Sequence, residues 1–192
     1  MKIIRLTAAD EKRYTDFLLQ DPRSLVYVSL SYRDLLRRHL SCGSVILAAE
    51  EDGRLLGVYP LMFSPPGKYG PVANSLPYYG SNGGILTAPE LRDSAAEQHV
   101  WSALLEAGEA LVREHGCASF TVVESPFDPH KEWYRRFFRE DCGDYRIGQL
   151  TFLPEDTADL PERLLALYLT IFMIIIQTKQ LVKLVDLRLT ML

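Results

Sequence analysis

The chain has 192 residues, of which 47% are hydrophobic and 24% are charged. These values are ordinary for a soluble globular protein, and the length predicts one domain, or one domain and a fragment of another. The formal net charge of −4 excludes the basic footprint of a nucleic-acid-binding protein, so we expect no DNA partner. The three cysteines are not spaced as metal ligands, which predicts free thiols and no metal site. Residues Met1–Leu6 are too short and too interrupted for a signal peptide, and the expected location is the cytoplasm.

Residues 1–43 predict a strand followed by two helices. Lys2–Leu6 alternates enough to form the strand. Thr7-Ala8-Ala9-Asp10 resembles a capping box, so an amphipathic helix is expected to follow as far as about Leu19. Ser31–Asp34 has the same pattern and predicts a second helix, which Gly43 is expected to end as its C-cap.

Two apolar runs then predict a β-hairpin. They are Ser44–Ala49 and Arg54–Phe63, and Asp52-Gly53 lies in the turn between them. Asp-Gly is a strong hairpin signal because Gly adopts a positive φ without a Cβ clash. Pro60 cannot donate to a ladder, so we expect a bulge or a sheet edge near it.

The segment Leu76–Thr87 is the most unusual in the chain. It places two adjacent tyrosines, an amide and three glycines between apolar ends. This composition suits a backbone that bends sharply and comes close to a ligand, but it also suits a bulged strand followed by a turn.

The second half of the chain predicts helix, strand, helix and strand. Apolar residues recur at spacings of four, four, three and four along one helical face, which Gly116 ends: Ala96, Val100, Leu104, Ala107 and Leu111. Ala118–Glu124 reads as a buried strand, Asp128-Pro129 begins a helix, and Tyr145–Leu153 reads as a last strand. The order predicts an α/β or α+β fold, with a mixed central sheet flanked by helices.

We divide the chain into a domain at residues 1–158 and an atypical apolar tail at 159–192. The tail contains thirteen consecutive uncharged residues, Leu164–Ile176, fewer than the roughly 18 that span a bilayer. Three readings remain open. The run is a buried helix or strand, it makes a peripheral membrane contact, or the tail is not a native continuation because the gene is truncated or frameshifted.

Three motifs resemble the first half of FemAB-like proteins, members of the GNAT acyltransferase superfamily. They are an aromatic-led helix at Tyr27–Leu36, a hairpin at Glu51–Leu61 and a glycine segment at Leu76–Gly84, in this order. The resemblance covers roughly Thr7 to Leu153. It implies a GNAT-like fold and a role in moving an acyl or aminoacyl group onto an amine of a cell-wall or envelope precursor. The implied donor is acyl-CoA or aminoacyl-tRNA, and the implied partner is a small-molecule, lipid-linked or nucleotide-linked precursor.

The same resemblance implies a second GNAT-like half. That half usually begins where Leu160–Tyr168 stands and continues with a basic helix. This chain departs from the pattern at about Leu169, where apolar residues replace the basic ones. Complete activity is therefore expected only if a second half is supplied.

The candidate substrate-binding residues all come from these motifs: Tyr32, Tyr78, Tyr79, Asn82, Gly83 and Gly84. The candidate catalytic residue is Glu124, because it ends a predicted buried strand where open α/β sheets bind ligands, and a carboxylate can act as a general base for an attacking amine. A solvated strand end is the alternative for Glu124, and core, surface or turn positions are the alternatives for the tyrosines and Asn82. His130 is expected to be exposed at the start of a helix.

The sequence identifies no cofactor. GNAT enzymes that use acetyl-CoA normally show a Gln/Arg-x-x-Gly-x-Gly/Ala loop that holds the pyrophosphate at a helix N-terminus. Gly80–Gly84 is rich in glycine but lacks that spacing, so we expect no useful affinity for acetyl-CoA. Besides a FemAB-like transferase half, two readings stay open: a non-catalytic binding module with the GNAT fold, and a stand-alone acetyl-CoA-dependent N-acetyltransferase.

Overall fold

The computed structural model of the chain describes residues 1–75, 83–123, 125, 127 and 130–138. All of these residues belong to one unit, Met1–Asp144. The predicted strand Tyr145–Leu153, the boundary at residue 158 and the tail 159–192 lie outside the described residues. The three readings of the tail, its membrane contact included, therefore stay predictions.

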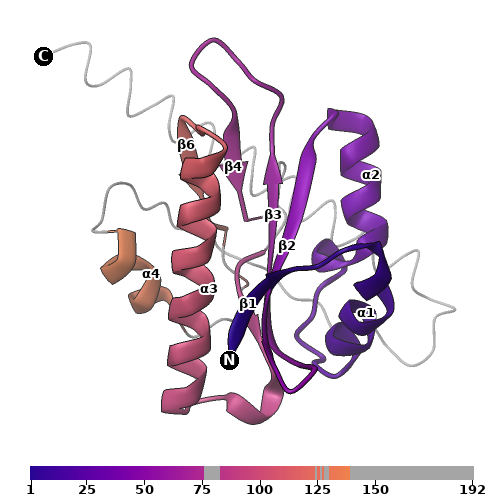
Figure 1. Ribbon diagram of the computed structural model, residues 1–192, viewed down its shortest axis with the longest axis vertical. Coiled ribbons are helices and arrows are strands. Elements are labelled where there is room, and N and C mark those ends of the chain that lie inside the picture. Colours follow the sequence, from indigo (N-terminus) through magenta and orange to yellow (C-terminus); the bar gives the residue numbers. More distant parts are fainter. Residues whose placement is uncertain (76–82, 124, 126, 128–129, 139–192) are drawn as a thin grey trace, which may run out of the picture. The chain divides into compact units, whose positions relative to one another are not determined.

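A mixed sheet forms the centre of the fold (Figure 1). Its strands are listed here in chain order: β1 (Lys2–Arg5), β2 (Gly43–Glu51), β3 (Arg54–Phe63), β4 (Val72–Asn74), β5 (Leu86–Thr87) and β6 (Ser119–Thr121). The order across the sheet is β1-β2-β3-β4-β6, and β5 pairs with β3 beside β4. All described pairs are antiparallel except β4 with β6, which is parallel. The predicted mixed central sheet is confirmed.

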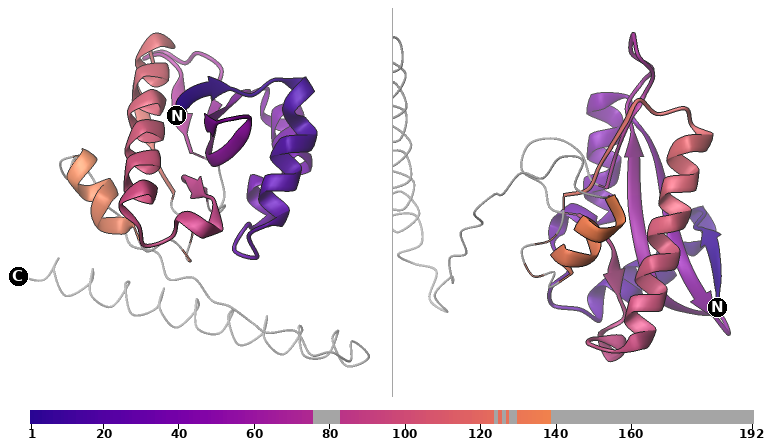
Figure 2. Two further views of the ribbon diagram at one scale, coloured as in Figure 1. Left: turned by 60° about the horizontal axis from the view of Figure 1, so that its bottom comes forward. Right: turned by 90° about the vertical axis from the view of Figure 1, so that its left-hand side faces the viewer.

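Helices cover both faces of this sheet (Figure 2). The helices α1 (Glu11–Leu19) and α2 (Leu30–Leu40) lie on one face, and α3 (Ala95–Glu114) lies on the other. The short helix α4 (Lys131–Phe138) packs on the α3 side, where Trp133 meets Trp101 edge to face with ring centroids 5.4 Å apart. Three single 3-10 turns complete the described helices: η1 (Ala8–Asp10), η2 (Val26–Val28) and η3 (Pro89–Leu91).

Each face of the sheet has its own hydrophobic core. The core under α3 joins inward residues of the sheet to one helical face, and its central members are Leu47, Tyr59, Leu61, Trp101, Leu104 and Leu105. The core under α1 is built from Tyr14, Phe17, Leu18, Val28, Ile46, Ala48, Leu55, Val58 and Ala88. Neighbouring strand residues alternate between the two cores because successive side chains of a strand point to opposite faces.

The predicted hairpin is confirmed. β2 and β3 pair antiparallel from Gly43 with Phe63 to Glu51 with Arg54. Asp52 and Gly53 form the turn with φ values of 49° and 78°. The bulge lies at Leu56, the residue without a partner between the pairs Ala49–Gly57 and Glu50–Leu55, and not at Pro60.

Pro60 lies instead opposite a gap between β5 and β4, where its missing N–H interrupts no described strand pairing. The Leu56 carbonyl accepts from the Ala88 N–H at 2.9 Å, and the Ser64 N–H donates to the Val72 carbonyl at 2.9 Å. Alternate residues of a strand direct their backbone polar groups to the same side, so Pro60 turns its nitrogen toward this same side of β3. Among the described strands, β5 pairs with Gly57-Val58 and β4 pairs with Met62-Phe63, which leaves Pro60 between them.

Two of the predicted helix boundaries are wrong. The first capping box is confirmed, since Thr7 donates through its backbone N–H and its hydroxyl to Asp10 Oδ2, at 3.0 and 2.9 Å. The second helix begins at Leu30, because Ser29 rather than Ser31 accepts the capping hydrogen bond, from the Tyr32 N–H at 3.2 Å. Ser41, with φ at 52°, is its C-cap, because Gly43 already pairs in β2.

The predicted buried strand Ala118–Glu124 is also less buried than expected. Its described strand, β6, has Phe120 half-buried between the exposed Ser119 and Thr121.

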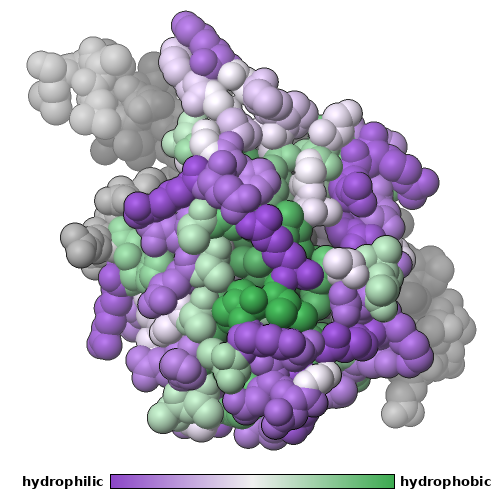
Figure 3. All heavy atoms as spheres, viewed as in Figure 1, coloured by the Kyte–Doolittle hydropathy of each residue, from purple (hydrophilic) through white to green (hydrophobic). Residues whose placement is uncertain are grey.

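The space-filling view of the face seen in Figure 1 shows apolar side chains gathered in its middle and polar ones around them (Figure 3). No described helix is long and apolar enough to cross a membrane.

Candidate functional site

Three hydrogen bonds gather the chain at the end of β6. The Ser75 N–H donates to the Thr121 carbonyl at 2.9 Å, and Ser75 Oγ accepts from the Val123 N–H at 2.9 Å. The Gly83 N–H donates to the Val123 carbonyl at 2.6 Å. Ser75 and Gly83, the described residues on either side of segment 76–82, therefore lie together at the carboxyl end of the parallel pair β4–β6, where open α/β sheets bind ligands.

Two of the predicted site residues are described at this place. Gly83 and Gly84 are both buried. Gly84 has φ at 95°, a region that side-chain-bearing residues rarely adopt, so the sharp bend expected here is present. Four other predicted residues lie outside the described residues: Tyr78, Tyr79, Asn82 and Glu124. In the sequence, Tyr78, Tyr79 and Asn82 lie between Ser75 and Gly83, and Glu124 directly follows Val123.

Tyr32, the remaining predicted residue, lies in the first turn of α2. It is half-buried, and its ring packs edge to face against Tyr27, with ring centroids 5.3 Å apart. Tyr27 lies in the 3-10 turn η2, so the predicted aromatic-led helix at Tyr27–Leu36 is an α-helix only from Leu30 onward. A contact between Tyr32 and a substrate stays a prediction.

A buried carboxylate joins the glycine segment to α3 and α4. Glu97, in the first turn of α3, is 2% exposed. Its Oε1 accepts from the Thr87 hydroxyl at 2.5 Å and lies 3.1 Å from His130 Nε2. Its Oε2 accepts from the Asp93 N–H at 2.8 Å, and its own N–H donates to Ser94 Oγ at 3.1 Å. One side chain therefore ties the end of β5 and the start of α4 to the start of α3.

The electrostatics of this network keep Glu97 ionised. Burial raises the pKa of Glu97, but the hydrogen bonds from Thr87, His130 and the Asp93 backbone outweigh it and lower the pKa below its ordinary value. A carboxylate near a helix N-terminus is also stabilised by the helix dipole. The first turn of α3 therefore contains a buried negative charge, the carboxylate of Glu97.

Aromatic side chains complete the wall around this network. The ring of His130 stacks on Trp133 with centroids 3.9 Å apart and planes 4° apart. Trp101 packs edge to face on Tyr134 with centroids 4.7 Å apart. The Tyr134 hydroxyl accepts from the Ile85 N–H at 3.1 Å, which fixes the residue that follows Gly84. Among the described residues, Trp101 Nε1 is buried without a hydrogen-bond partner.

Comparison with known proteins was made at three levels. No protein-family model matches the chain, and no curated protein matches it. Solved structures do. A probable acetyltransferase is 23% identical, with a TM-score of 0.52 over 81% of this chain and 99% of its own.

Two further structures match to a similar extent. The ribosomal-protein-alanine N-acetyltransferase of Brucella melitensis biovar Abortus 2308 is 16% identical, with a TM-score of 0.51 over 79% of this chain and 100% of its own. An aminoglycoside acetyltransferase from an uncultured soil metagenomic sample is 14% identical, with a TM-score of 0.52 over 80% of this chain and 96% of its own. The chain has the GNAT fold. At these identities the likeness establishes the fold and nothing finer.

The GNAT fold makes the first turn of α3 informative. In acetyl-CoA-dependent members, backbone N–H groups at a helix N-terminus hold the pyrophosphate. In this chain, α3 begins at Ala95, and the Asp93 N–H beside its N-cap donates to Glu97. The carboxylate of Glu97 therefore already occupies a backbone donor at this end of α3.

Sequence reasoning missed both Glu97 and His130. The apolar spacing selected Ala96, which is exposed, whereas Glu97 lies on the buried face with Val100 and Trp101. A carboxylate three and four residues before large apolar residues was the available signal. His130 was expected to be exposed, and it is 9% exposed because Glu97 and Trp133 both contact it. The described residues contain no group of three potential metal ligands.

Proposed function

We propose that this chain is the N-terminal, GNAT-fold half of a FemAB-like transferase. It acts on an amine of a cell-wall or envelope precursor and receives an acyl or aminoacyl group from an activated donor. Two independent features support the proposal: the three ordered sequence motifs, and the GNAT fold that contains them.

The observation that carries the proposal is the meeting of Ser75, Gly83 and Val123 at the end of β6. In the sequence, these three residues border segment 76–82 and Glu124, which contain four of the candidate residues: Tyr78, Tyr79, Asn82 and Glu124. Gly83 and Gly84 leave room for the close approach of a substrate backbone, because neither has a side chain.

In the proposed reaction, the lone pair of the acceptor amine attacks the acyl carbonyl carbon and forms the new C–N bond. The bond from that carbon to the donor oxygen breaks, and the donor leaves as a hydroxyl after gaining a proton. Glu124 takes the proton lost by the amine, the role of a general base. Tyr78, Tyr79 and Asn82 hold the acceptor through stacking and hydrogen bonds.

The carboxylate of Glu97 favours an aminoacyl-tRNA ester over acetyl-CoA as the donor. An anion already accepts the Asp93 N–H at the first turn of α3, and two like charges held close together repel. A pyrophosphate could not accept from the Asp93 N–H unless Glu97 Oε2 were displaced from it. This feature disfavours the stand-alone N-acetyltransferase reading.

The test combines binding with transfer. A nucleotide-linked muramyl pentapeptide with a free side-chain amine is titrated into the full chain, and its N-acetylated form is the control. Amide formation is then followed by mass spectrometry, with the second half added in trans and with aminoacyl-tRNA or acetyl-CoA as donor. The Glu124→Gln variant is compared with Glu132→Gln, which removes an exposed carboxylate from α4.

We expect the free amine form to bind and the aminoacyl group to be transferred. Glu124→Gln should slow transfer by about 10²–10⁴-fold with unchanged binding, while Glu132→Gln behaves as wild type. Absence of precursor binding overturns the proposal. Transfer from acetyl-CoA, with micromolar binding of CoA, establishes the N-acetyltransferase reading instead.

A further inference from the structure

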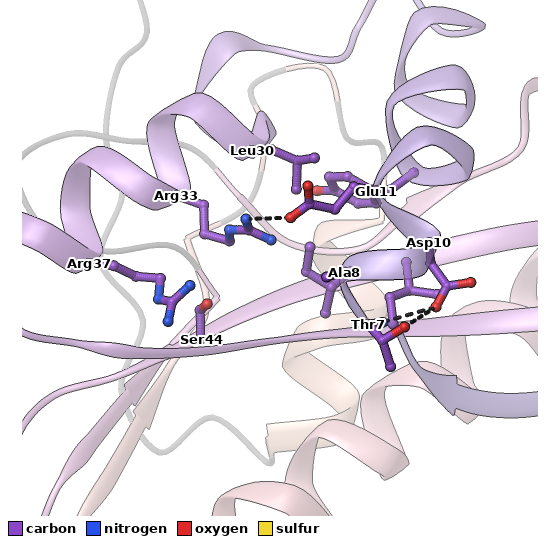
Figure 4. A pocket seen from close by; sticks show the side chains of 11 residues that line it. Thr7, Ala8, Asp10, Glu11, Leu30, Arg33, Arg37 and Ser44 are labelled. Atoms are coloured by element: carbon purple, nitrogen blue, oxygen red, sulfur yellow. Dashed lines mark hydrogen bonds and ion pairs between the residues drawn. The ribbon is translucent and has the colours of Figure 1, made fainter.

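A cavity lies on the face of the sheet that α1 and α2 cover. It has a volume of about 210 Å³ and lies between the end of β1, the first turns of α1, the middle of α2 and the start of β2 (Figure 4). Tyr14 and Ile46, which line it, belong to the core under α1, whereas Trp101 belongs to the core under α3. The cavity is therefore separate from the site proposed above.

The cavity is large enough for a small organic molecule. An apolar cavity of about 150 Å³ accommodates benzene. A second, open hollow shares Glu11, Arg33 and Arg37 with the cavity and continues along α2 to Cys42. The cavity thus opens to solvent along this helix.

One of its two arginines is fully engaged. Arg33 Nη2 donates to Glu11 Oε1 at 3.0 Å, and Arg33 Nε donates to Asp34 Oδ1 at 2.8 Å. Burial lowers the pKa of Arg33, but these two carboxylates outweigh it and raise the pKa above its ordinary value. Arg33 and Glu11 are therefore a fixed, mutually neutralised pair in the cavity wall.

The other arginine has its hydrogen-bonding capacity unused. Within the described part of the chain, Arg37 makes no hydrogen bond, and its nearest carboxylate oxygen is Asp34 Oδ1 at 3.9 Å. Its side chain is 52% exposed. Figure 4 shows its guanidinium beside Ser44 at one end of the cavity. The Ser44 hydroxyl also makes no hydrogen bond to a described residue. A guanidinium beside a hydroxyl is a donor set suited to a carboxylate.

The rest of the lining sets the size and charge of the ligand. Leu6, Leu30 and Ile46 form an apolar part of the wall. The Tyr14 hydroxyl donates to the Val28 carbonyl at 2.6 Å, so Tyr14 presents mainly its ring. At the far end, Asp10 and Glu11 are carboxylates, and these disfavour a ligand with several negative charges.

We propose that this cavity binds a small monocarboxylate with a short apolar chain. The carboxylate lies on Arg37 and Ser44, and the apolar chain lies against Leu30 and Ile46. The recognition is charge-assisted at one end and hydrophobic at the other. This inference does not depend on the transferase proposal, because the two sites share no described residue.

The test uses sodium butyrate as the probe and the full ¹⁵N-labelled chain. Butyramide, the neutral isostere, and sodium chloride at matched ionic strength are the controls. We expect saturable amide shifts near Arg37 and Ser44 with butyrate, and none with butyramide. Arg37→Gln should weaken binding by at least about 10-fold, since it removes the charged donor. Lys12→Gln, which removes an exposed cation of α1 that lines neither the cavity nor the second hollow, should bind as wild type.

Ser44→Ala is the second variant and should weaken binding by a smaller factor. The amide spectrum of each variant also reports whether it is folded, so loss of binding is separated from loss of structure. Shifts that rise linearly without saturation, equal shifts with butyramide, or full binding by Arg37→Gln would each overturn the proposal.

Discussion

The close packing of α3 on β3 predicts how Gly108→Ala changes the free energy of unfolding. Two opposing contributions decide the sign of that change. A Cβ added to Gly108 would lie 2.7 Å from Tyr59 Cε1 and 3.1 Å from Tyr59 Cδ1. Tyr59 is 0% exposed, so its ring has no free space to enter. The same close approach recurs at Gly57, where a Cβ would lie 2.8 Å from Val100 Cγ1.

Gly108→Ala therefore has two opposite effects on stability: higher helix propensity stabilises the fold, and overpacking against Tyr59 destabilises it. Alanine in a helix interior is more favourable than glycine by about 1 kcal/mol. Overpacking a buried site costs about 1–3 kcal/mol. The net expectation is a loss of about 0–2 kcal/mol in the free energy of unfolding. For a chain of this length, that loss lowers Tm by up to about 4–8 °C.

The measurement is thermal and urea unfolding followed by tryptophan fluorescence. Gly43→Ala is the matched control, because its Cβ would meet only Phe63 Cβ, at 3.9 Å. It should be neutral or stabilising by up to about 1 kcal/mol. In a Tyr59→Leu background, which lacks Cε1, Gly108→Ala should be better tolerated, with a coupling energy of about 0.5–3 kcal/mol.

A rise in Tm of about 2–4 °C for Gly108→Ala would refute this reasoning. That result would mean that alanine stabilises the helix by its full propensity advantage over glycine, and that α3 does not lie this close to β3. An equal effect of Gly108→Ala in the Tyr59→Leu background would assign the cost to another neighbour.

Three further substitutions test the buried polar groups. Glu97→Gln should cost about 1–3 kcal/mol at pH 7, because the new amide cannot accept from every former donor. This difference from wild type should disappear as the pH falls below 4.5, since the pKa of Glu97 in the folded chain lies below that ordinary value. Asp21→Asn should cost about 1–3 kcal/mol, because Asp21 is 4% exposed and its Oδ1 forms an ion pair with Arg92 Nη2 at 2.6 Å. Tyr59→Phe should be neutral or stabilising, because the described residues offer no partner to its buried hydroxyl.

Each of these outcomes is measured by urea unfolding, the first over a pH series. A Glu97→Gln deficit that does not shrink at all as the pH falls below 4.5 would mean that the folded-state carboxylate is not the source of the stability. An unchanged Asp21→Asn variant would show that the Arg92 contact contributes nothing. A loss above about 1 kcal/mol for Tyr59→Phe would show that the hydroxyl is bonded.

The sequence by itself determined the features that depend on neighbouring residues. Asp52-Gly53 specified the hairpin because a positive φ there is a local steric property. The spacing of Val100, Leu104 and Leu111 specified a long helix because side chains three and four apart share one face. The mixed sheet followed from the order of these elements.

Only the tertiary structure decided which polar groups are buried and where the strands of the sheet leave a gap. Glu97 is buried because Thr87 and His130, from other elements, supply its hydrogen bonds, and no local pattern encodes that meeting. Pro60 is tolerated because β4 and β5 pair on either side of it. The cavity beside Arg37 likewise exists only where two helices and two strands converge. Local periodicity reports forces within a few residues, whereas desolvation and ion pairing depend on contacts that the whole fold creates.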